Sequence, residues 1–266
     1  MSLQNTQNTQ IMTPATFSYR TLLYVILGVV AIALIFWLGY TCGNSPTYSY
    51  DGDRSVALIN SQNTHPIYVE VLRDSPKMML LHNFLTPEEC EELIQMGEDL
   101  GFGRSTVQGN TNEVSQDRTS HTRNFKRGEN DAVRAIEKRV TCFSGLPPEN
   151  TEPLQIVKYD PTQQYKPHYD FFVPGVVGTD VALQRGGQRH VTFFCYLNDL
   201  PESEEGAHTE FPKLNLKIRP KKGMAVYWLN VHPDTREDFR TLHSGNPPKN
   251  STKYGLNIWV RKGKFM

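Results

Sequence analysis

The chain has 266 residues, a length that corresponds to one or two domains. Hydrophobic residues make up 38% of it and charged residues 21%, an ordinary globular composition that excludes a disordered or collagen-like chain. The 28 basic residues balance the 28 acidic ones, so the composition argues against a protein that binds nucleic acid through bulk positive charge.

An uncharged stretch lies between Arg20 and Asp51, and residues 21–42 within it are predominantly apolar. A helix of this length can cross a hydrocarbon core about 30 Å thick. A cleaved signal peptide fits less well, because the run is longer than the usual apolar region of such a peptide and a largely polar segment precedes it. A buried core helix fits poorly because the run is apolar all round. We therefore predict a transmembrane anchor over residues 21–42, preceded by a short cytoplasmic tail over residues 1–20.

The charges that flank this segment predict its orientation. Arg20 is the only basic residue before the span, and Arg54 is the first one after it. The positive-inside rule then favours a cytoplasmic N-terminus and a lumenal or external C-terminal part. Residues 43–64 are rich in Ser, Asn and Thr and have neither a helical nor a strand period, so we predict a stalk there. The globular domain is predicted over residues 65–266.

Two helices are predicted at the start of this domain. Thr86 is a good N-cap, Pro87 suits the first helical position, and Glu89 completes a capping box. This helix should run to about Leu100. A second helix is predicted over residues 131–143, where apolar residues recur at helical spacing.

Short β-rich runs separated by turn residues dominate the rest of the domain. Such a series is typical of an all-β sandwich or barrel. We therefore predict an α+β, mainly β fold, in which helices buttress one side of a β-sandwich core. The predicted strands cover residues 67–72, 77–82, 154–159, 165–172, 190–197, 216–219, 224–229, 241–244 and 254–260.

A His-x-Asp pair, His168 and Asp170, lies within one of these strands. Residues two apart in a strand point to the same face, so the imidazole and the carboxylate should project side by side. Two histidines and one carboxylate form a facial triad that leaves positions open on Fe(II). A second such tripeptide, at residues 232–234, contains a proline, which cannot donate to a sheet ladder, and we interpret it as a turn.

His243 is the best candidate for the third metal ligand, since it lies in a short strand that enters a turn. The loop after it should bring the next strand back beside the first, which would place Lys253 near His243 on a neighbouring strand. A buried lysine is costly unless an anion pairs with it. An open iron site beside such a cation suggests a cosubstrate that chelates iron and carries a distal carboxylate, as 2-oxoglutarate does. The alternative is that Lys253 is a solvated surface charge.

These residues belong to a longer pattern. From about Val69 to Lys264 the chain resembles prolyl 4-hydroxylases of the plant and algal type, which are Fe(II)- and 2-oxoglutarate-dependent dioxygenases. The resemblance implies a double-stranded β-helix, or jelly-roll, core. The matching stretches, in order, are HNFLTPEEC, RTS, IEKRV, LQIVKYDPTQQYKPHYDFF, GGQR, the FP of TEFP, PKKGMAVYW, LHSGNP and IWVR.

The resemblance also implies roles for individual residues. His168, Asp170 and His243 would bind Fe(II); Lys253, Tyr159 and Thr209 would contact 2-oxoglutarate; Arg118 and Arg189 would contact the peptide.

Some positions depart from the family pattern. His208 stands where the family has an acidic or small residue, three extra residues occur around residues 201–205, Thr162 replaces a glycine, and Asn246 replaces a cysteine. These changes affect the expected peptide preference and disulfide pattern more than the chemistry. The four cysteines are too few for a disulfide scaffold. The three inside the domain are buried thiols or include one bridge, and we favour thiols: Cys90, Cys142 and Cys195.

The reaction implied by the resemblance is hydroxylation of a peptidyl proline at C4, coupled to oxidative decarboxylation of 2-oxoglutarate to succinate and CO₂. O₂ is the oxidant, ascorbate would return over-oxidised iron to Fe(II), and the substrate would be a proline-rich or collagen-like peptide. Anchored family members are type II proteins of the endoplasmic reticulum, in agreement with the charge-based orientation. Two alternatives stay open: the same chemistry on another residue or a small molecule, and a membrane-tethered binding module without turnover.

Overall fold

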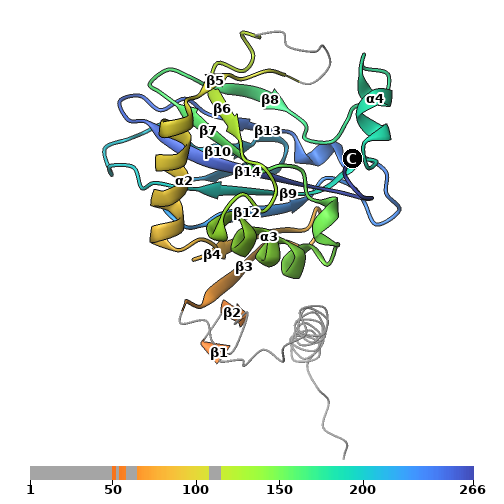
Figure 1. The fold of residues 1–266 in the computed structure, drawn as a ribbon, viewed down its shortest axis with the longest axis horizontal. Coiled ribbons are helices and arrows are strands. Elements are labelled where there is room, and N and C mark those ends of the chain that lie inside the picture. Colours follow the sequence, from red (N-terminus) through yellow and green to blue (C-terminus); the bar gives the residue numbers. More distant parts are fainter. Residues whose placement is uncertain (1–49, 52–53, 58–64, 108–114) are drawn as a thin grey trace, which may run out of the picture.

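The computed structural model describes residues 50–51, 54–57, 65–107 and 115–266 (Figure 1). The predicted tail and transmembrane anchor, residues 1–42, lie outside this part. Among the described residues, no helix has the length and apolar character needed to cross a membrane.

Two antiparallel sheets form the body of the domain. In the described part of the chain, the larger sheet has ten strands in the order β1-β2-β3-β4-β12-β9-β14-β7-β6-β5, and the smaller has four in the order β11-β10-β13-β8. This mainly β arrangement agrees with the predicted jelly-roll core. The strands are β1 (Tyr50–Asp51), β2 (Arg54–Ala57), β3 (Ile67–Arg73), β4 (Met78–His82), β5 (Gly103–Arg104), β6 (His121–Asn124), β7 (Gln155–Tyr159), β8 (Tyr165–His168), β9 (Arg189–Tyr196), β10 (Thr209–Phe211), β11 (Leu216–Ile218), β12 (Ala225–Leu229), β13 (His243–Gly245) and β14 (Lys253–Arg261).

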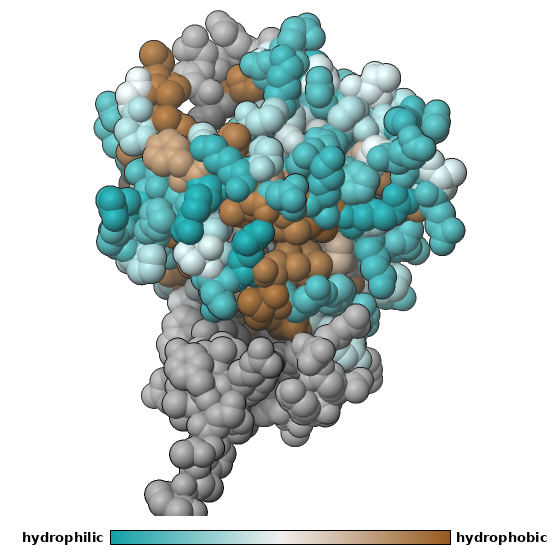
Figure 2. All heavy atoms as spheres, turned by 180° about the vertical axis from the view of Figure 1, so that it is seen from behind, coloured by the Kyte–Doolittle hydropathy of each residue, from teal (hydrophilic) through white to brown (hydrophobic). Residues whose placement is uncertain are grey.

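Helices cover one face of the larger sheet, as predicted (Figure 1). The capping box at the start of the first helix is present: the Thr86 hydroxyl accepts from the Glu89 amide (3.2 Å), and the Glu89 carboxylate accepts from the Thr86 amide (2.9 Å). The opposite side of the molecule carries mostly hydrophilic side chains, with apolar ones showing between them (Figure 2). The helices are α2 (Pro87–Leu100), α3 (Asp131–Ser144) and α4 (Thr179–Gln184), with 3-10 turns η1 (Pro148–Asn150), η2 (Pro212–Leu214) and η3 (Phe239–Thr241).

The central strands of the larger sheet are buried on both faces, which explains the almost continuous apolar run of β9. Phe193 and Cys195 pack in the core cluster between the sheet and the helices. Phe194 and Tyr196 alternate with them and pack in the second cluster, together with Phe211 of the smaller sheet. Because successive side chains of a strand point to opposite faces, one strand supplies both cores.

Several boundaries differ from the sequence prediction. The strand predicted over residues 165–172 ends at His168, because the Gln188 side-chain amide, in place of a neighbouring strand, bonds both the N–H and the C=O of Phe172. The predicted stalk includes the short strands β1 and β2, which extend the sheet beyond β3. The prediction missed β5, β6, β10 and α4, which are short and carry little apolar periodicity.

The expected pairing of the strands that carry His243 and Lys253 is wrong. β13 pairs with β10 and β8 in the smaller sheet, whereas β14 lies between β9 and β7 in the larger one. The connection over residues 246–252 therefore crosses from one sheet to the other. The two strands face the interior of the sandwich from opposite sides.

The three cysteines of the domain do not all have the same oxidation state. Cys90 and Cys195 are buried free thiols, and burial raises the pKa of Cys90 to about 12. Cys142 takes part in a disulfide. The preference for thiols is thus right at two positions and wrong at the third.

Candidate metal centre and cosubstrate pocket

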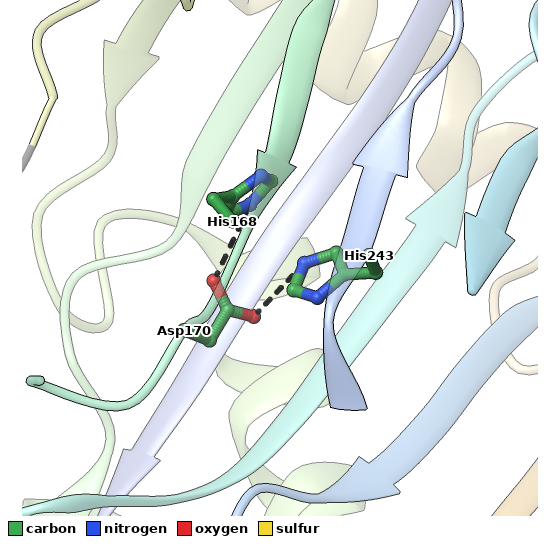
Figure 3. Close-up of side chains that lie close together, drawn as sticks. All are labelled: His168, Asp170 and His243. Carbon is green, nitrogen blue, oxygen red and sulfur yellow. Dashed lines mark ion pairs between the residues drawn. The ribbon is translucent and has the colours of Figure 1, made fainter. Parts of the chain in front are cut away.

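His168, Asp170 and His243 converge at one end of the smaller sheet (Figure 3). His168 is the last residue of β8, His243 is the first of β13, and the two are register partners. Asp170 Oδ1 lies 3.9 Å from His168 Nε2, and its Oδ2 lies 3.7 Å from His243 Nε2. All three ligand atoms lie within 4.8 Å of one another.

Both imidazoles are held in the tautomer that a metal requires. His168 Nδ1 lies 2.8 Å from the Lys166 carbonyl, and His243 Nδ1 lies 2.9 Å from the Thr241 carbonyl. A carbonyl can only accept, so each Nδ1 carries a proton, and in the neutral ring Nε2 has the lone pair that a metal needs. Burial, with a further contribution from the neighbouring His243, lowers the pKa of His168 well below its usual value, which keeps that ring neutral.

A chain of hydrogen bonds orients the carboxylate. The Thr192 hydroxyl donates to Asp170 Oδ2 (2.8 Å) and accepts from the Asn230 side-chain amide (2.8 Å). Asn230 in turn accepts from the indole N–H of Trp228 (2.8 Å). All three donors are buried, so Asp170 is fixed as an acceptor facing the two imidazoles.

This donor set fits Fe(II). Two neutral imidazoles and one carboxylate on one side of a metal leave the remaining positions open, and this arrangement is typical of non-haem iron oxygenases. The second tripeptide, with His232 and Asp234, forms a turn as predicted: the Thr235 amide donates to the His232 carbonyl (2.8 Å). Its residues are not part of the cluster.

A pocket that is open to solvent lies beside the cluster. Its walls are largely aromatic, and the Tyr165 ring stacks on His168 at 3.4 Å between ring centroids. The lining residues come from both sheets: Tyr159, Tyr165, His168, Phe194, Thr209, Trp228, His243, Ser244, Gly245, Asn257 and Trp259.

Lys253 is fully buried against this pocket, which excludes the surface-charge alternative. Its Nζ lies 4.6 Å from the centre of the Tyr159 ring and 5.7 Å from that of Phe194. It donates to the carbonyl of Ala207 (2.9 Å), and within the described part of the chain no carboxylate forms an ion pair with it. Burial lowers the pKa of this lysine to about 7. A cation placed in this way is suited to bind an anionic ligand.

The other two residues expected to contact the cosubstrate, Tyr159 and Thr209, line the pocket. Tyr159 is the register partner of Lys253 across β7 and β14, and burial raises the pKa of its phenol to about 12. The Thr209 hydroxyl accepts from the Tyr196 hydroxyl (2.8 Å), so its own proton is available for donation. Both hydroxyls can therefore donate to an anion beside Lys253.

The two arginines expected to contact the peptide, Arg118 and Arg189, already have partners within the domain. Arg118 donates to the Gln155 side chain (2.7 Å) and lies over the Tyr165 ring at 4.8 Å. Arg189 makes two bonds to the Glu152 carboxylate (2.7 and 2.9 Å) and lies 3.7 Å from the centre of a Trp259 ring. Each arginine thus packs on an aromatic residue that lines the pocket.

Sequence reasoning missed Tyr165, Trp259 and Thr192. Trp259 could have been found, because it lies an even number of residues from Lys253 on one strand and therefore on the same face. Tyr165 lies in the strand of His168, but its stacking on that imidazole reflects a tilt of the ring that sequence does not specify. Thr192 comes from the other sheet, and no local signal connects it to Asp170.

The fold and this site define an iron- and 2-oxoglutarate-dependent dioxygenase. Residues 154–261 match the model of the 2OG-Fe(II) oxygenase superfamily. Prolyl 4-hydroxylase 5 of Arabidopsis thaliana is 34% identical over 220 residues, which cover 74% of this chain and 72% of the relative. Prolyl 4-hydroxylase 1 of the same plant is 33% identical over 227 residues, which cover 79% of this chain and 76% of the relative.

A solved structure agrees with these relatives. The viral collagen prolyl hydroxylase of Paramecium Bursaria Chlorella virus-1, solved as a complex with 2OG, has a TM-score of 0.56 and 29% identity. The match covers 69% of this chain and 95% of that one. The chain therefore belongs to the prolyl 4-hydroxylase family within the 2OG-Fe(II) oxygenase superfamily, and the resemblance found in the sequence is confirmed.

Proposed function

We propose that this protein hydroxylates proline residues in proline-rich or collagen-like segments of peptides and proteins, with conversion of 2-oxoglutarate to succinate and CO₂ in the same turnover. The observation that carries the proposal is the juxtaposition, across the two sheets, of a facial triad and a buried lysine without an acidic partner in the described residues. An iron ligand set and a single buried cation suit a bidentate chelator with a distal carboxylate.

In this proposal one set of residues binds the metal and another binds the cosubstrate. His168, Asp170 and His243 hold Fe(II), which supplies, with O₂ and 2-oxoglutarate, the oxidising chemistry. Lys253 pairs with the distal carboxylate, and the Tyr159 and Thr209 hydroxyls donate to it. The apolar walls exclude water, so these polar contacts act in a medium of low dielectric constant.

The peptide would enter on the side of the pocket that Tyr165 and Trp259 line. Their rings offer flat apolar surfaces on which a proline ring can pack. Arg118 and Arg189 pack on these rings, and we propose that they tune the peptide site through them.

The cellular setting is part of the proposal. Residues 21–42 would anchor the catalytic domain as a type II protein in the endoplasmic reticulum, with the domain in the lumen. Ascorbate would act there as the reductant of over-oxidised iron.

The test is succinate release from 2-oxoglutarate by the full-length protein in detergent, with (Pro)n, Gly-X-Pro or lysine-containing peptides. We expect succinate release to increase with the proline peptides, and mass spectrometry with amino-acid analysis to find 4-hydroxyproline. The matched control is His168→Ala, which should be inactive. Hydroxylation of the lysine peptide alone, or of no peptide, would refute the substrate assignment.

A further inference from the structure

A buried carboxylate outside the pocket, that of Glu204, joins two segments of the chain. The residue lies between β9 and β10 and is only 2% exposed. Four backbone N–H groups donate to it, those of Gly206 (3.0 Å) and Lys249 (2.8 Å) to Oε1 and those of Asn250 (2.9 Å) and Ser251 (3.1 Å) to Oε2.

The negative charge of this carboxylate strengthens its hydrogen bonds to the two segments. Desolvation raises the pKa of Glu204, but the backbone donors of Asn250, Lys249 and Gly206 outweigh it and lower the pKa to about 2. Hydrogen bonds to an ionised acceptor are about twice as strong as neutral ones. The turn that presents Glu204 is itself held, because Arg219 donates to the carbonyls of Pro201 and Glu204 (2.6 Å each).

Both joined segments lead directly to Lys253. Residues 246–252 connect β13, which begins with His243, to β14, which begins with Lys253. On the other side of the junction, the carbonyl of Ala207 accepts the hydrogen bond from Lys253 Nζ (2.9 Å). Glu204 thus bonds to the loop that precedes the lysine and lies three residues from the carbonyl that receives its ammonium group.

The two segments fit together closely. A Cβ on Gly206 would lie 2.2 Å from the Pro247 carbonyl oxygen, and the Ala207 amide donates to that same carbonyl (2.9 Å). Ala207 has a φ of 65°, in the left-handed region that non-glycine residues rarely adopt. Such a conformation persists only where the surrounding structure fixes it.

We propose that Glu204 is a positioning residue of the cosubstrate site: it locks residues 204–207 to the 246–252 loop and thereby places Lys253 relative to the metal ligand His243. This inference rests on the proposed role of Lys253 in binding 2-oxoglutarate. Removal of the lock should weaken binding of the cosubstrate. It should change metal affinity little, because the β13 strand that carries His243 is held by its pairing with β8 and β10.

The test compares Glu204→Gln with Glu205→Gln in the full-length protein loaded with Mn(II). Glu205 is a matched control, because its exposed carboxylate pairs, among the described residues, only with the exposed ammonium of Lys249. Calorimetric titration should show that the Kd of 2-oxoglutarate rises about tenfold or more in Glu204→Gln, because preorganisation is lost. The Kd of Mn(II) should change by less than about threefold. Glu205→Gln should match the wild type.

A merely structural role would lower metal affinity, cosubstrate affinity and thermal stability together, and that result would overturn the proposal. An unchanged Kd for 2-oxoglutarate in Glu204→Gln would do the same. If the variant does not fold, hydrogen exchange of the wild-type protein tests whether Glu204 and the cosubstrate site are coupled. Coupling is reciprocal, so 2-oxoglutarate should slow exchange of the amides of Gly206, Asn250 and Ser251 about fivefold or more. Equal rates with and without it would refute the coupling.

These assays need no peptide, so a failure of proline hydroxylation would remove the proposed substrate and leave this test intact. A wild-type protein that does not bind 2-oxoglutarate would overturn both proposals.

Discussion

Replacement of Lys253 should affect binding of 2-oxoglutarate more than any other single change outside the metal ligands. The ammonium is fully buried and its neighbours are aromatic rings, so a carboxylate bound there would have little water to replace the lost cation. Breaking a buried ion pair costs about 3–5 kcal/mol. At about 1.4 kcal/mol per tenfold, this corresponds to an increase in Kd of roughly a hundredfold to several thousandfold.

The size of the replacement side chain should determine where in that range the increase in the Kd of 2-oxoglutarate lies. Lys253→Ala leaves a void that water can enter, so the loss should be near the lower limit. Lys253→Met fills much of the same volume without a charge, so the loss should be near the upper limit. Lys253→Arg keeps the charge and should recover part of the affinity, though its geometry differs.

The assay is calorimetric titration of 2-oxoglutarate into anaerobic Mn(II)-loaded protein, with Mn(II) affinity measured separately. Metal affinity should stay nearly unchanged, because Lys253 is not among the ligand atoms. Lys249→Ala, which removes an exposed lysine of the same connection, is the matched control. A Kd for 2-oxoglutarate that stays within about threefold of the wild type in Lys253→Met would refute the assignment.

Three further outcomes follow from the site. Alanine at any of the three metal ligands should abolish turnover and weaken Mn(II) binding, whereas His232→Ala should do neither; the reverse pattern would mean that the wrong pair was chosen. Thr192→Val, which removes the bond to Asp170, should weaken Mn(II) binding about 10- to 100-fold in the same titration, and no change would show that the hydroxyl is dispensable. The pKa of about 7 makes Lys253 mostly neutral above that pH, so 2-oxoglutarate must bind together with a proton. Its Kd should be flat below about pH 7 and rise up to tenfold per pH unit above it, whereas Lys253→Arg should show no such rise.

Local signals in the sequence predicted the parts of the fold that local interactions determine. Thr86, Pro87 and Glu89 mark the start of α2 because a capping box is made within four residues. Part of the convergence of the three candidate metal ligands could be predicted for a similar reason, since His168 and Asp170 are two residues apart. β10 was missed because its three residues form a strand only through pairing with β11 and β13.

The placement of Lys253 shows where such reasoning stops. The length of the loop after His243 is compatible with a hairpin and with a crossover between sheets, and only the packing of the whole sandwich decides between them. The lysine still faces the pocket, but from the opposite sheet to the one expected. The same limit applies to Thr192, which lies in the larger sheet, whereas its partner Asp170 follows a strand of the smaller sheet.

The division of the site between two sheets has a consequence for how the protein matures. The smaller sheet carries His168 and His243, and the larger one carries Tyr159 and Lys253, so a folding intermediate with only one sheet formed has half a site. Such long-range contacts form late, after the entropy of closing long loops has been overcome. Metal and cosubstrate therefore stabilise only the finished sandwich, each by about 2.7 kcal/mol at a hundredfold excess over its Kd. A newly made chain in a compartment poor in iron or 2-oxoglutarate would lose that stabilisation, so the supply of its own reactants would influence how much of the enzyme survives cellular quality control.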